Sequence, residues 1–98
     1  MKHKCYIAGQ ISGLDSEEYI NNFEKAKQEV VALGYEPISP LDLEHGNSES
    51  WEDYMKLDLK ALIDCDYIYM LNNWNNSRGA KIELRIAMDL KIETIMQK

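Results

Sequence analysis

The chain has 98 residues, of which 45% are hydrophobic and 29% are charged, and its formal net charge is −6. This balance fits a single globular domain over residues 1–98 and argues against long disordered regions. The acidic charge argues against a nucleic-acid polymer as partner, since such binding needs clustered Lys and Arg. Without a signal peptide pattern or a long apolar run, no membrane partner is expected, and the expected location is cytoplasmic.

The first predicted element is a strand at residues 5–9 (CYIAG), a short apolar run that ends in glycine. A helix is predicted over residues 16–33, where apolar side chains recur at helical spacing. Asp15 and Glu18 have the spacing of a capping box at its start, and Gly34 is suited to end it.

A second strand is predicted at residues 35–39 (YEPIS), where Pro40 ends it. A turn-rich segment follows and leads to a second helix over residues 51–64. Ser50 and Asp53 again have the spacing of a capping box, which places the start of this helix.

A third strand is predicted at residues 66–71 (DYIYML), then a third helix that Ser77 caps and that runs to about Leu90, and a last strand at residues 92–96 (IETIM). Alternating strands and helices imply parallel pairing through right-handed crossovers. The predicted fold class is therefore α/β, a three-layer Rossmann-like or flavodoxin-like architecture with about four parallel strands and three helices. In such sheets ligands bind where the carboxyl ends of the strands meet, an edge formed here by residues 9–13, 40–47 and 72–79.

Two acidic residues fall on helix faces that point toward the core. At ~100° per residue, Asp58 shares a face with Trp51, Tyr54, Met55, Ala61, Leu62 and Cys65, and Glu83 shares one with Ala80, Leu84, Ala87 and Leu90. A carboxylate held away from water is costly unless it is paired, protonated or placed in a cleft. Each acid taken alone also fits a structural role, satisfied by a helix cap, a tyrosine or an arginine. Because both helices flank the same sheet edge, we expect the two acids to share a site.

Two turns at this edge are suited to bind an anion. The segment AGQISG after the first strand offers backbone amides and a serine, and Ser77, Arg78 and Gly79 offer amides, a hydroxyl and a guanidinium. The glycine segment lacks the dinucleotide and Walker spacings, so it also fits a plain turn. The two turns together predict a phosphate site.

The cysteines and histidines predict neither a disulfide nor a metal site. Cys5 and Cys65 have no C-x-x-C spacing, and both are expected to be reduced, buried thiols. His3 and His45 are isolated in the sequence and are expected to be surface or turn residues. No metal or other cofactor is expected, because the carboxylates have no histidines at ligand spacing.

Three segments, YIAGQISG, DLKALIDCDYIYML and NSRGAKIELRIA, resemble the nucleoside 2-deoxyribosyltransferase superfamily over nearly the whole chain. They most resemble a small branch found in phages and bacteria and related to the deoxynucleoside-monophosphate N-glycosidases. The resemblance implies that Glu83 is a nucleophile on C1′ of a deoxyribosyl group and that Asp58 positions or protonates the departing base. It also implies that Tyr6 and the loop at residues 9–13 line the sugar or its 5′ end.

The resemblance is most informative at Ser77. Transferases of free nucleosides tend to have an aspartate here for the 5′-hydroxyl, whereas the monophosphate N-glycosidases have a serine that helps to bind the 5′-phosphate. Ser77 beside Arg78 suits a dianion, which an aspartate would repel. The predicted substrate-binding residues are Tyr6, Gly9, Gln10, Ser12, Gly13, Ser77, Arg78, Gly79 and Trp74. Trp74 either offers a surface on which the base stacks or packs against its own domain.

The predicted function is an N-glycosidase that forms a glycosyl-enzyme and acts on a small nucleotide or nucleoside. The sequence ends at Lys98 without the C-terminal extension of the transferases, so water is the expected acceptor. A transferase and a module that binds nucleotides without turnover are the alternatives. Because a site on so small a domain needs walls from a second subunit, a homodimer or higher homo-oligomer is expected.

Overall fold

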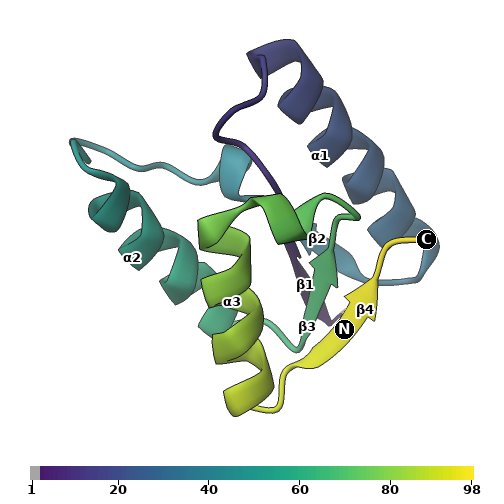
Figure 1. The fold of residues 1–98 in the computed structure, drawn as a ribbon. Helices are drawn as coiled ribbons and strands as arrows, with labels where there is room; N and C mark the ends of the chain where they lie inside the picture. Colours follow the sequence, from purple (N-terminus) through teal and green to yellow (C-terminus); the bar gives the residue numbers. More distant parts are fainter. Residues whose placement is uncertain (1–2) are drawn as a thin grey trace.

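In the computed structural model, which describes residues 3–98, four parallel strands form one sheet in the order β2-β1-β3-β4 (Figure 1). The strands are β1 (Lys4–Ala8), β2 (Glu36–Ile38), β3 (Tyr67–Met70) and β4 (Glu93–Met96). The helices are α1 (Ser16–Ala32), α2 (Trp51–Ile63) and α3 (Arg78–Asp89), and the short 3-10 turns are η1 (Pro40–Asp42) and η2 (Trp74–Asn76). The predicted α/β class, with its strand and helix order, is confirmed.

The helices cover both faces of the sheet and give three layers, with α1 on one face and α2 and α3 on the other (Figure 1). The side chains of β1 alternate between these layers, since Cys5 and Ile7 pack with α1 while Tyr6 and Ala8 lie on the side of α2 and α3. Both faces of the strand are therefore buried, which explains its continuous apolar run.

The strand order places a crevice between β1 and β3. The chain leaves β1 through α1 to reach β2 on one side, and then crosses the opposite face through α2 to reach β3 on the other side. Ligands bind at such a reversal, outside the carboxyl ends of the strands. Gly9 follows β1 at this point, where an added Cβ would overlap the Leu71 side chain, so the glycine lets the two loops approach closely.

Serine side chains cap the two helices that flank this crevice. Ser50 Oγ accepts a hydrogen bond from the Asp53 amide, and Ser77 Oγ accepts one from the Ala80 amide, each at 3.1 Å. Gly34 follows α1 with a φ of 94°, a conformation that costs glycine little. These three predicted helix boundaries are confirmed.

Two predictions about helix ends are wrong. Asp15 is the N-cap residue of α1, but its side chain makes no capping hydrogen bond, and the acidic Glu17 and Glu18 instead complement the dipole of the first turn. Leu90 is 53% exposed rather than buried, because α3 ends at Asp89 and the backbone turns away at Lys91 with a φ of 61°.

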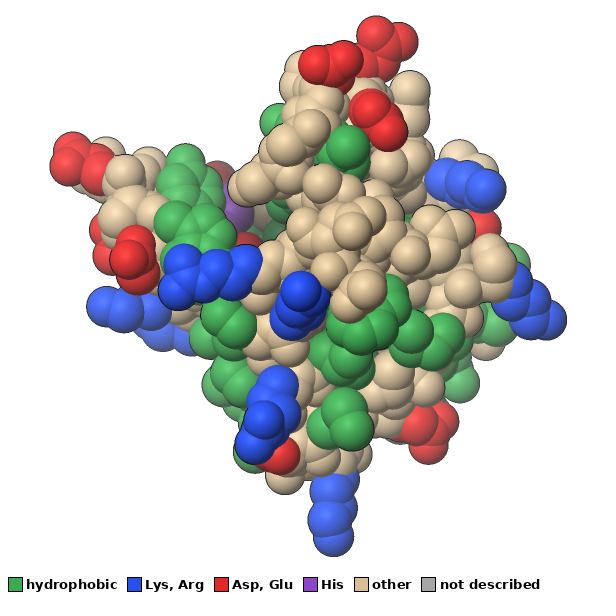
Figure 2. Space-filling view, in the orientation of Figure 1, with side chains coloured by type: hydrophobic (Ala, Val, Ile, Leu, Met, Phe, Trp, Pro, Cys, Tyr) green, Lys and Arg blue, Asp and Glu red, His purple; other side chains and the backbone are tan. Residues whose placement is uncertain are grey.

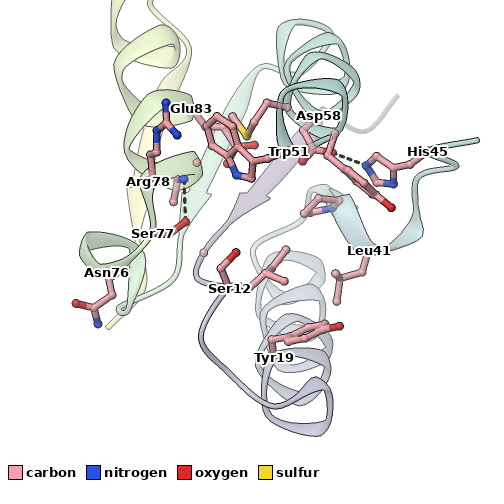
Figure 3. Close-up of a pocket in the computed structure, with 17 residues that line it drawn as sticks. Ser12, Tyr19, Leu41, His45, Trp51, Asp58, Asn76, Ser77, Arg78 and Glu83 are labelled. Atoms are coloured by element: carbon pink, nitrogen blue, oxygen red, sulfur yellow. Dashed lines mark hydrogen bonds and ion pairs between the residues drawn. The ribbon is translucent and has the colours of Figure 1, made fainter. Parts of the chain in front are cut away.

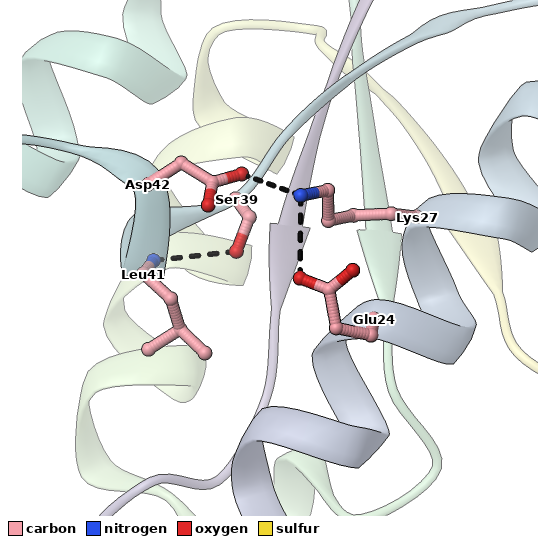
Figure 4. Close-up of polar contacts among 5 residues, drawn as sticks. All are labelled: Glu24, Lys27, Ser39, Leu41 and Asp42. Atoms are coloured by element: carbon pink, nitrogen blue, oxygen red, sulfur yellow. Dashed lines mark hydrogen bonds and ion pairs between the residues drawn. The ribbon is translucent and has the colours of Figure 1, made fainter.

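Lys27 of α1 contacts the loop after β2, which also has a hydrogen bond of its own (Figure 4). Lys27 Nζ donates to Asp42 at 2.8 Å and to Glu24 at 3.3 Å. Ser39 Oγ accepts a hydrogen bond of 3.2 Å from the Leu41 amide and so caps η1. The loop therefore enters the sheet edge in a defined position.

The two thiols of the chain lie in the core. Cys5 and Cys65 are free and buried, as predicted. Burial raises the pKa of each thiol to about 12, which leaves both unreactive at neutral pH. Across residues 3–98, no helix combines the length and apolar character that crossing a membrane requires.

Candidate active site

A cavity of about 460 Å³ lies at the carboxyl edge of the sheet. The loops after β1 and β2 form one side, and α2 and the start of α3 form the other (Figure 3). Figure 3 shows Ser12, Tyr19 and Leu41 on one wall and Trp51, Arg78 and Glu83 on the facing wall. The volume lies within the range of small-molecule sites.

Glu83 lies at the base of the cavity, at the second turn of α3. The helix starts close to α2 because Gly79 has no side chain, since a Cβ there would lie only 3.0 Å from Met55 Sδ. Glu83 is 5% exposed, and its Oε2 accepts a 2.6 Å hydrogen bond from the hydroxyl of the fully buried Tyr6. Its other oxygen, Oε1, is therefore the one available to a ligand.

Burial dominates the titration of Glu83 and its partner. The pKa of Glu83 is raised from 4.5 to about 8, mainly by loss of hydration and further by the nearby charge of Asp58, while the hydrogen bond from Tyr6 opposes the rise. Burial, together with the carboxylates of Glu83 and Asp58, raises the pKa of Tyr6 well above its ordinary value. Tyr6 therefore acts as a hydrogen-bond donor that stays neutral, and the free protein at pH 7 holds Glu83 mostly protonated.

Asp58 lies on the inner face of α2 and pairs with a histidine. His45 Nε2 and Asp58 Oδ1 are 2.8 Å apart, and the two side chains are only 16% and 13% exposed (Figure 3). Burial raises the pKa of Asp58, and the hydrogen bond and charge of His45 work against this rise. The Tyr54 ring packs on the imidazole, with ring centroids 4.5 Å apart.

The start of α3 gives the cavity mouth its anion-binding groups. Ser77 Oγ accepts the capping hydrogen bond from Ala80, so its hydroxyl hydrogen is free to be donated to a ligand. The guanidinium carbon of Arg78 lies 4.2 Å from the centroid of the Trp51 ring, a cation–π contact at the edge of the cavity. The first residues of α3, Arg78 and Gly79, also line the cavity, so the amino-terminal end of this helix lies at its mouth.

Charge on the outer face of α3 favours the approach of an anion, although the chain as a whole is acidic. Arg78, Lys81 and Arg85 are exposed and recur along the helix, and Figure 2 shows Lys and Arg side chains along this part of the surface. Only Arg85 among them has an acidic partner, Asp89, at 3.3 Å. A small anion therefore meets a locally positive surface near the mouth of the cavity.

The structure brings most of the predicted site residues together. Of the predicted residues, those that line the cavity are Glu83, Asp58, Gly9, Ser12, Ser77, Arg78 and Gly79, and Tyr6 lies behind Glu83. Three predicted residues lie outside it. The backbone N–H of Gln10 donates to the side-chain oxygen of Asn73, and the side-chain N–H of Gln10 donates to the Ser12 carbonyl. Gly13 forms the turn beside Gln10. Trp74 packs against the core cluster on the side of α2 and α3 rather than facing the cavity.

Four aromatic residues of the cavity, Tyr19, His45, Trp51 and Tyr54, were not predicted to belong to it. His45 was expected to be a surface or turn residue, and it lies in a turn, but its side chain is half-buried against Asp58, a contact to which no local sequence pattern points. Trp51 and Tyr54 were placed on the same helix face as Asp58, and that shared face was the available signal. Tyr54 is 45% exposed, so this face borders the cavity and not the core at that position.

Comparison with known proteins places the chain in one family. The family model described as "Domain of unknown function (DUF4406)" matches residues 3–96. Among solved structures, the chain is similar to a 2-deoxyribosyltransferase from the psychrotolerant bacterium Bacillus psychrosaccharolyticus, with a TM-score of 0.71 and 23% identity. It is also similar to a 2-desoxiribosyltransferase from Leishmania mexicana, with a TM-score of 0.65 and 19% identity. No curated protein matches the sequence.

The structural similarity extends over almost all of this chain but not over all of the similar proteins. It covers 95% and 96% of this chain, against 70% of the Bacillus protein and 63% of the Leishmania protein. This chain therefore spans less than two thirds of the Leishmania protein. At these identities the match shows a shared fold, and it confirms the predicted resemblance to the 2-deoxyribosyltransferases at the level of the fold.

Proposed function

We propose that this chain, which belongs to the family described as a domain of unknown function (DUF4406), is an N-glycosidase that releases the base of a deoxynucleoside 5′-monophosphate. The observation that carries the proposal is the placement of Glu83 and Asp58 in one cavity whose mouth is formed by Ser77 and Arg78. A nucleophile, a second acid and a phosphate site are the three parts that this reaction needs.

In the proposed reaction Glu83 attacks the sugar directly. Its ionised Oε1 forms a bond to C1′ while the C1′–N bond breaks, with the electron pair going to the base, which takes up a proton. Water then attacks C1′, loses a proton, and displaces Glu83 as a carboxylate with overall retention of configuration. Tyr6 supports this role because its hydroxyl holds Oε2 and so orients the carboxylate.

The 5′-phosphate is the part of the substrate that the mouth of the cavity recognises. The Ser77 hydroxyl, the Arg78 guanidinium and the first amides of α3 supply hydrogen bonds and positive charge to a dianion. Ser12 lies on the facing wall, within the same cavity (Figure 3). This set of groups favours a nucleotide over a nucleoside as substrate, and the aromatic ring of Trp51 takes the role of base platform that the sequence suggested for Trp74.

One observation favours a second candidate function, nucleotide binding without turnover. With a pKa of about 8, Glu83 is mostly neutral at pH 7, and a neutral carboxyl group can hold a sugar hydroxyl without attacking C1′. The same cavity would then sequester or sense a nucleotide. This candidate predicts that calorimetry detects binding while the ligand stays intact.

The decisive experiment measures release of free base from the deoxynucleoside monophosphates and the matching deoxynucleosides by liquid chromatography. The parent protein is expected to cleave at least one monophosphate over many turnovers and the deoxynucleosides at least about tenfold more slowly, since a hydrogen bond to a charged group contributes about 1.5–3 kcal/mol. Adding a second free base to the mixture tests for transfer, because a transferase would join that base to the sugar and produce a new nucleotide.

The chain contains a matched control for Glu83. Glu29 accepts a 2.8 Å hydrogen bond from the hydroxyl of Tyr69 on the other face of the sheet, so it forms the same kind of pair away from the cavity. Glu83→Gln is expected to abolish base release, and Glu29→Gln is expected to leave it unchanged. If no monophosphate loses its base, or if Glu83→Gln cleaves as fast as the parent, the N-glycosidase proposal is wrong.

A further inference from the structure

His45 and Asp58 form a pair in the cavity, and the proposed reaction gives no role to His45 and none to the second oxygen of Asp58. The hydrogen bond joins His45 Nε2 to Asp58 Oδ1, so the other carboxyl oxygen, Oδ2, has no partner of its own in the structure of residues 3–98. Asp58 lines the cavity and is 13% exposed. Oδ2 is therefore the oxygen of Asp58 that is free to act on a ligand.

The surroundings of His45 fix the imidazole in this position. The residue lies in the loop between η1 and α2, where the backbone turns at Gly46 with a φ of 55°. Its carbonyl accepts hydrogen bonds from the amide and the hydroxyl of Ser48, and its ring packs on Tyr54. Contacts to both the backbone and the ring hold a side chain that would otherwise move with the loop.

The proposed reaction needs the proton on Asp58 and not on Glu83, which is the reverse of the free protein, where the charge of Asp58 helps to raise the pKa of Glu83. Glu83 must be ionised to attack C1′, and a second carboxylate in the same buried cavity would oppose that ionisation. An uncharged Asp58 with its proton on Oδ2 removes this repulsion. A neutral imidazole that donates Nε2–H to Oδ1 is the partner that suits this form of the acid.

We propose that His45 is a positioning residue for the release of the base: its neutral ring donates Nε2–H to Asp58 Oδ1 and thereby turns a protonated Oδ2 toward the leaving base. This inference rests on the proposed N-glycosidase function and adds the source of the proton. As Glu83 bonds to C1′, the C1′–N electron pair goes to the base nitrogen and the Oδ2 proton bonds there. Water later gives a proton back to Oδ2 as its oxygen bonds to C1′ and Glu83 is displaced.

A comparison of leaving groups tests the proposal. Cleavage is compared between a nucleotide whose base needs a proton to depart and one whose base departs without it. The pair is dGMP and 7-methyl-dGMP if the parent cleaves dGMP, or dUMP and 5-nitro-dUMP if it cleaves dUMP. His45→Ala is expected to lower kcat by about 10- to 100-fold for dGMP or dUMP, within the range that general acids contribute, and by less than about threefold for the activated partner. Uncatalysed loss of 7-methylguanine is subtracted.

Two further variants separate positioning from a general loss of structure. His45→Gln places an N–H donor near the same point and is expected to restore at least about a third of the parent kcat, as a hydrogen-bond donor would. His3→Ala removes the other histidine, which makes a 3.0 Å contact to Asp66 on the exposed surface. This variant is expected to cleave both substrates with the kcat of the parent. Thermal unfolding of each variant reports whether the fold is retained.

The outcomes distinguish this inference from the function on which it rests. Equal losses in His45→Ala for both leaving groups, or a His45→Gln variant no better than His45→Ala, overturn the assignment of His45 while base release by the parent still supports the N-glycosidase. A parent protein that releases the base from no deoxynucleoside monophosphate overturns the function and the inference together.

Discussion

Glu83 shows how one residue links activity to a cost in stability. Its pKa is 4.5 in an unfolded chain and about 8 in the folded protein, so between these values the folded state binds more protons than the unfolded state. The free energy of unfolding therefore falls as the pH rises from about 4.5 to about 8. Above about pH 8, Glu83 makes no further change to it. The full difference corresponds to at most roughly 5 kcal/mol, which local relaxation reduces.

Glu83→Gln is consequently expected to stabilise the protein in alkaline solution. The amide carries no charge and keeps an oxygen for the hydrogen bond from Tyr6, so the variant should gain about 1–3 kcal/mol over the parent at pH 9 and less than about 1 kcal/mol at pH 5. Urea unfolding at the two pH values measures both differences. The same change at Glu29 provides the control, since burial raises the pKa of Glu29 but hydrogen bonds from Gln97 and Tyr69 outweigh it and lower the pKa.

The same titration sets the pH dependence of the proposed reaction. The ionised form of Glu83 is the nucleophile, so kcat/KM should rise about tenfold per pH unit below the pKa of Glu83, up to about pH 8, and should fall again where Asp58 loses the proton that the base takes up. Initial rates of base release between pH 5 and pH 10 give this profile. A rate that is already constant from pH 5.5 upward would show that a different group, or an unburied carboxylate, performs the attack.

At the scale of elements, the starts of α2 and α3 are an internal comparison. Ser50 and Ser77 make the same capping hydrogen bond at 3.1 Å, but only Ser77 lines the cavity. Replacing either serine by alanine should cost about 1 kcal/mol of stability. Only Ser77→Ala should also weaken binding of a nucleoside monophosphate, by about tenfold, because it removes a donor to the phosphate as well as a cap.

Calorimetry with a deoxynucleoside monophosphate and urea unfolding of the two variants measure these effects independently. Equal affinities for the Ser50→Ala and Ser77→Ala variants would indicate that the phosphate lies elsewhere. A stability loss confined to one variant would show that the two caps are not equivalent, and the affinities would then be compared at matched fractions of folded protein.

The elements also show what the sequence determines and what it leaves open. Strands and helices were predicted to within a residue or two because apolar spacing and serine caps are local signals, and the inward positions of Asp58 and Glu83 followed from helix periodicity. His45 and Trp74 lie in irregular segments that have no such period. Their neighbours depend on how the loop before α2 and the turn after β3 fold back, and that is a tertiary property.

At the scale of the whole molecule, the strand order explains why distant residues converge on one cavity. Because β1 pairs in parallel with β2 on one side and β3 on the other, the loop after each of these strands opens at the same edge. The cavity is therefore built from segments that are far apart in sequence. This position follows from the topology, whereas the chemistry of the site follows from the few side chains placed there.

The surface of the molecule offers a contact for a homodimer away from the cavity, and so for a different reason than the walls of the site. Within residues 3–98 the three most exposed large apolar side chains are Met88 at 62%, Ile63 at 56% and Leu90 at 53%, and all three lie at the carboxyl-terminal ends of α2 and α3. Burying such side chains against a second copy is favourable, so light scattering should give a mass near twice 11.4 kDa at micromolar concentration. Met88→Glu should shift the mass to that of the monomer, because a charge in an apolar contact is costly, while Val31→Glu on the exposed face of α1 should not. A parent protein of 11.4 kDa in solution, or a dimer that tolerates Met88→Glu, would show that this surface is not the contact.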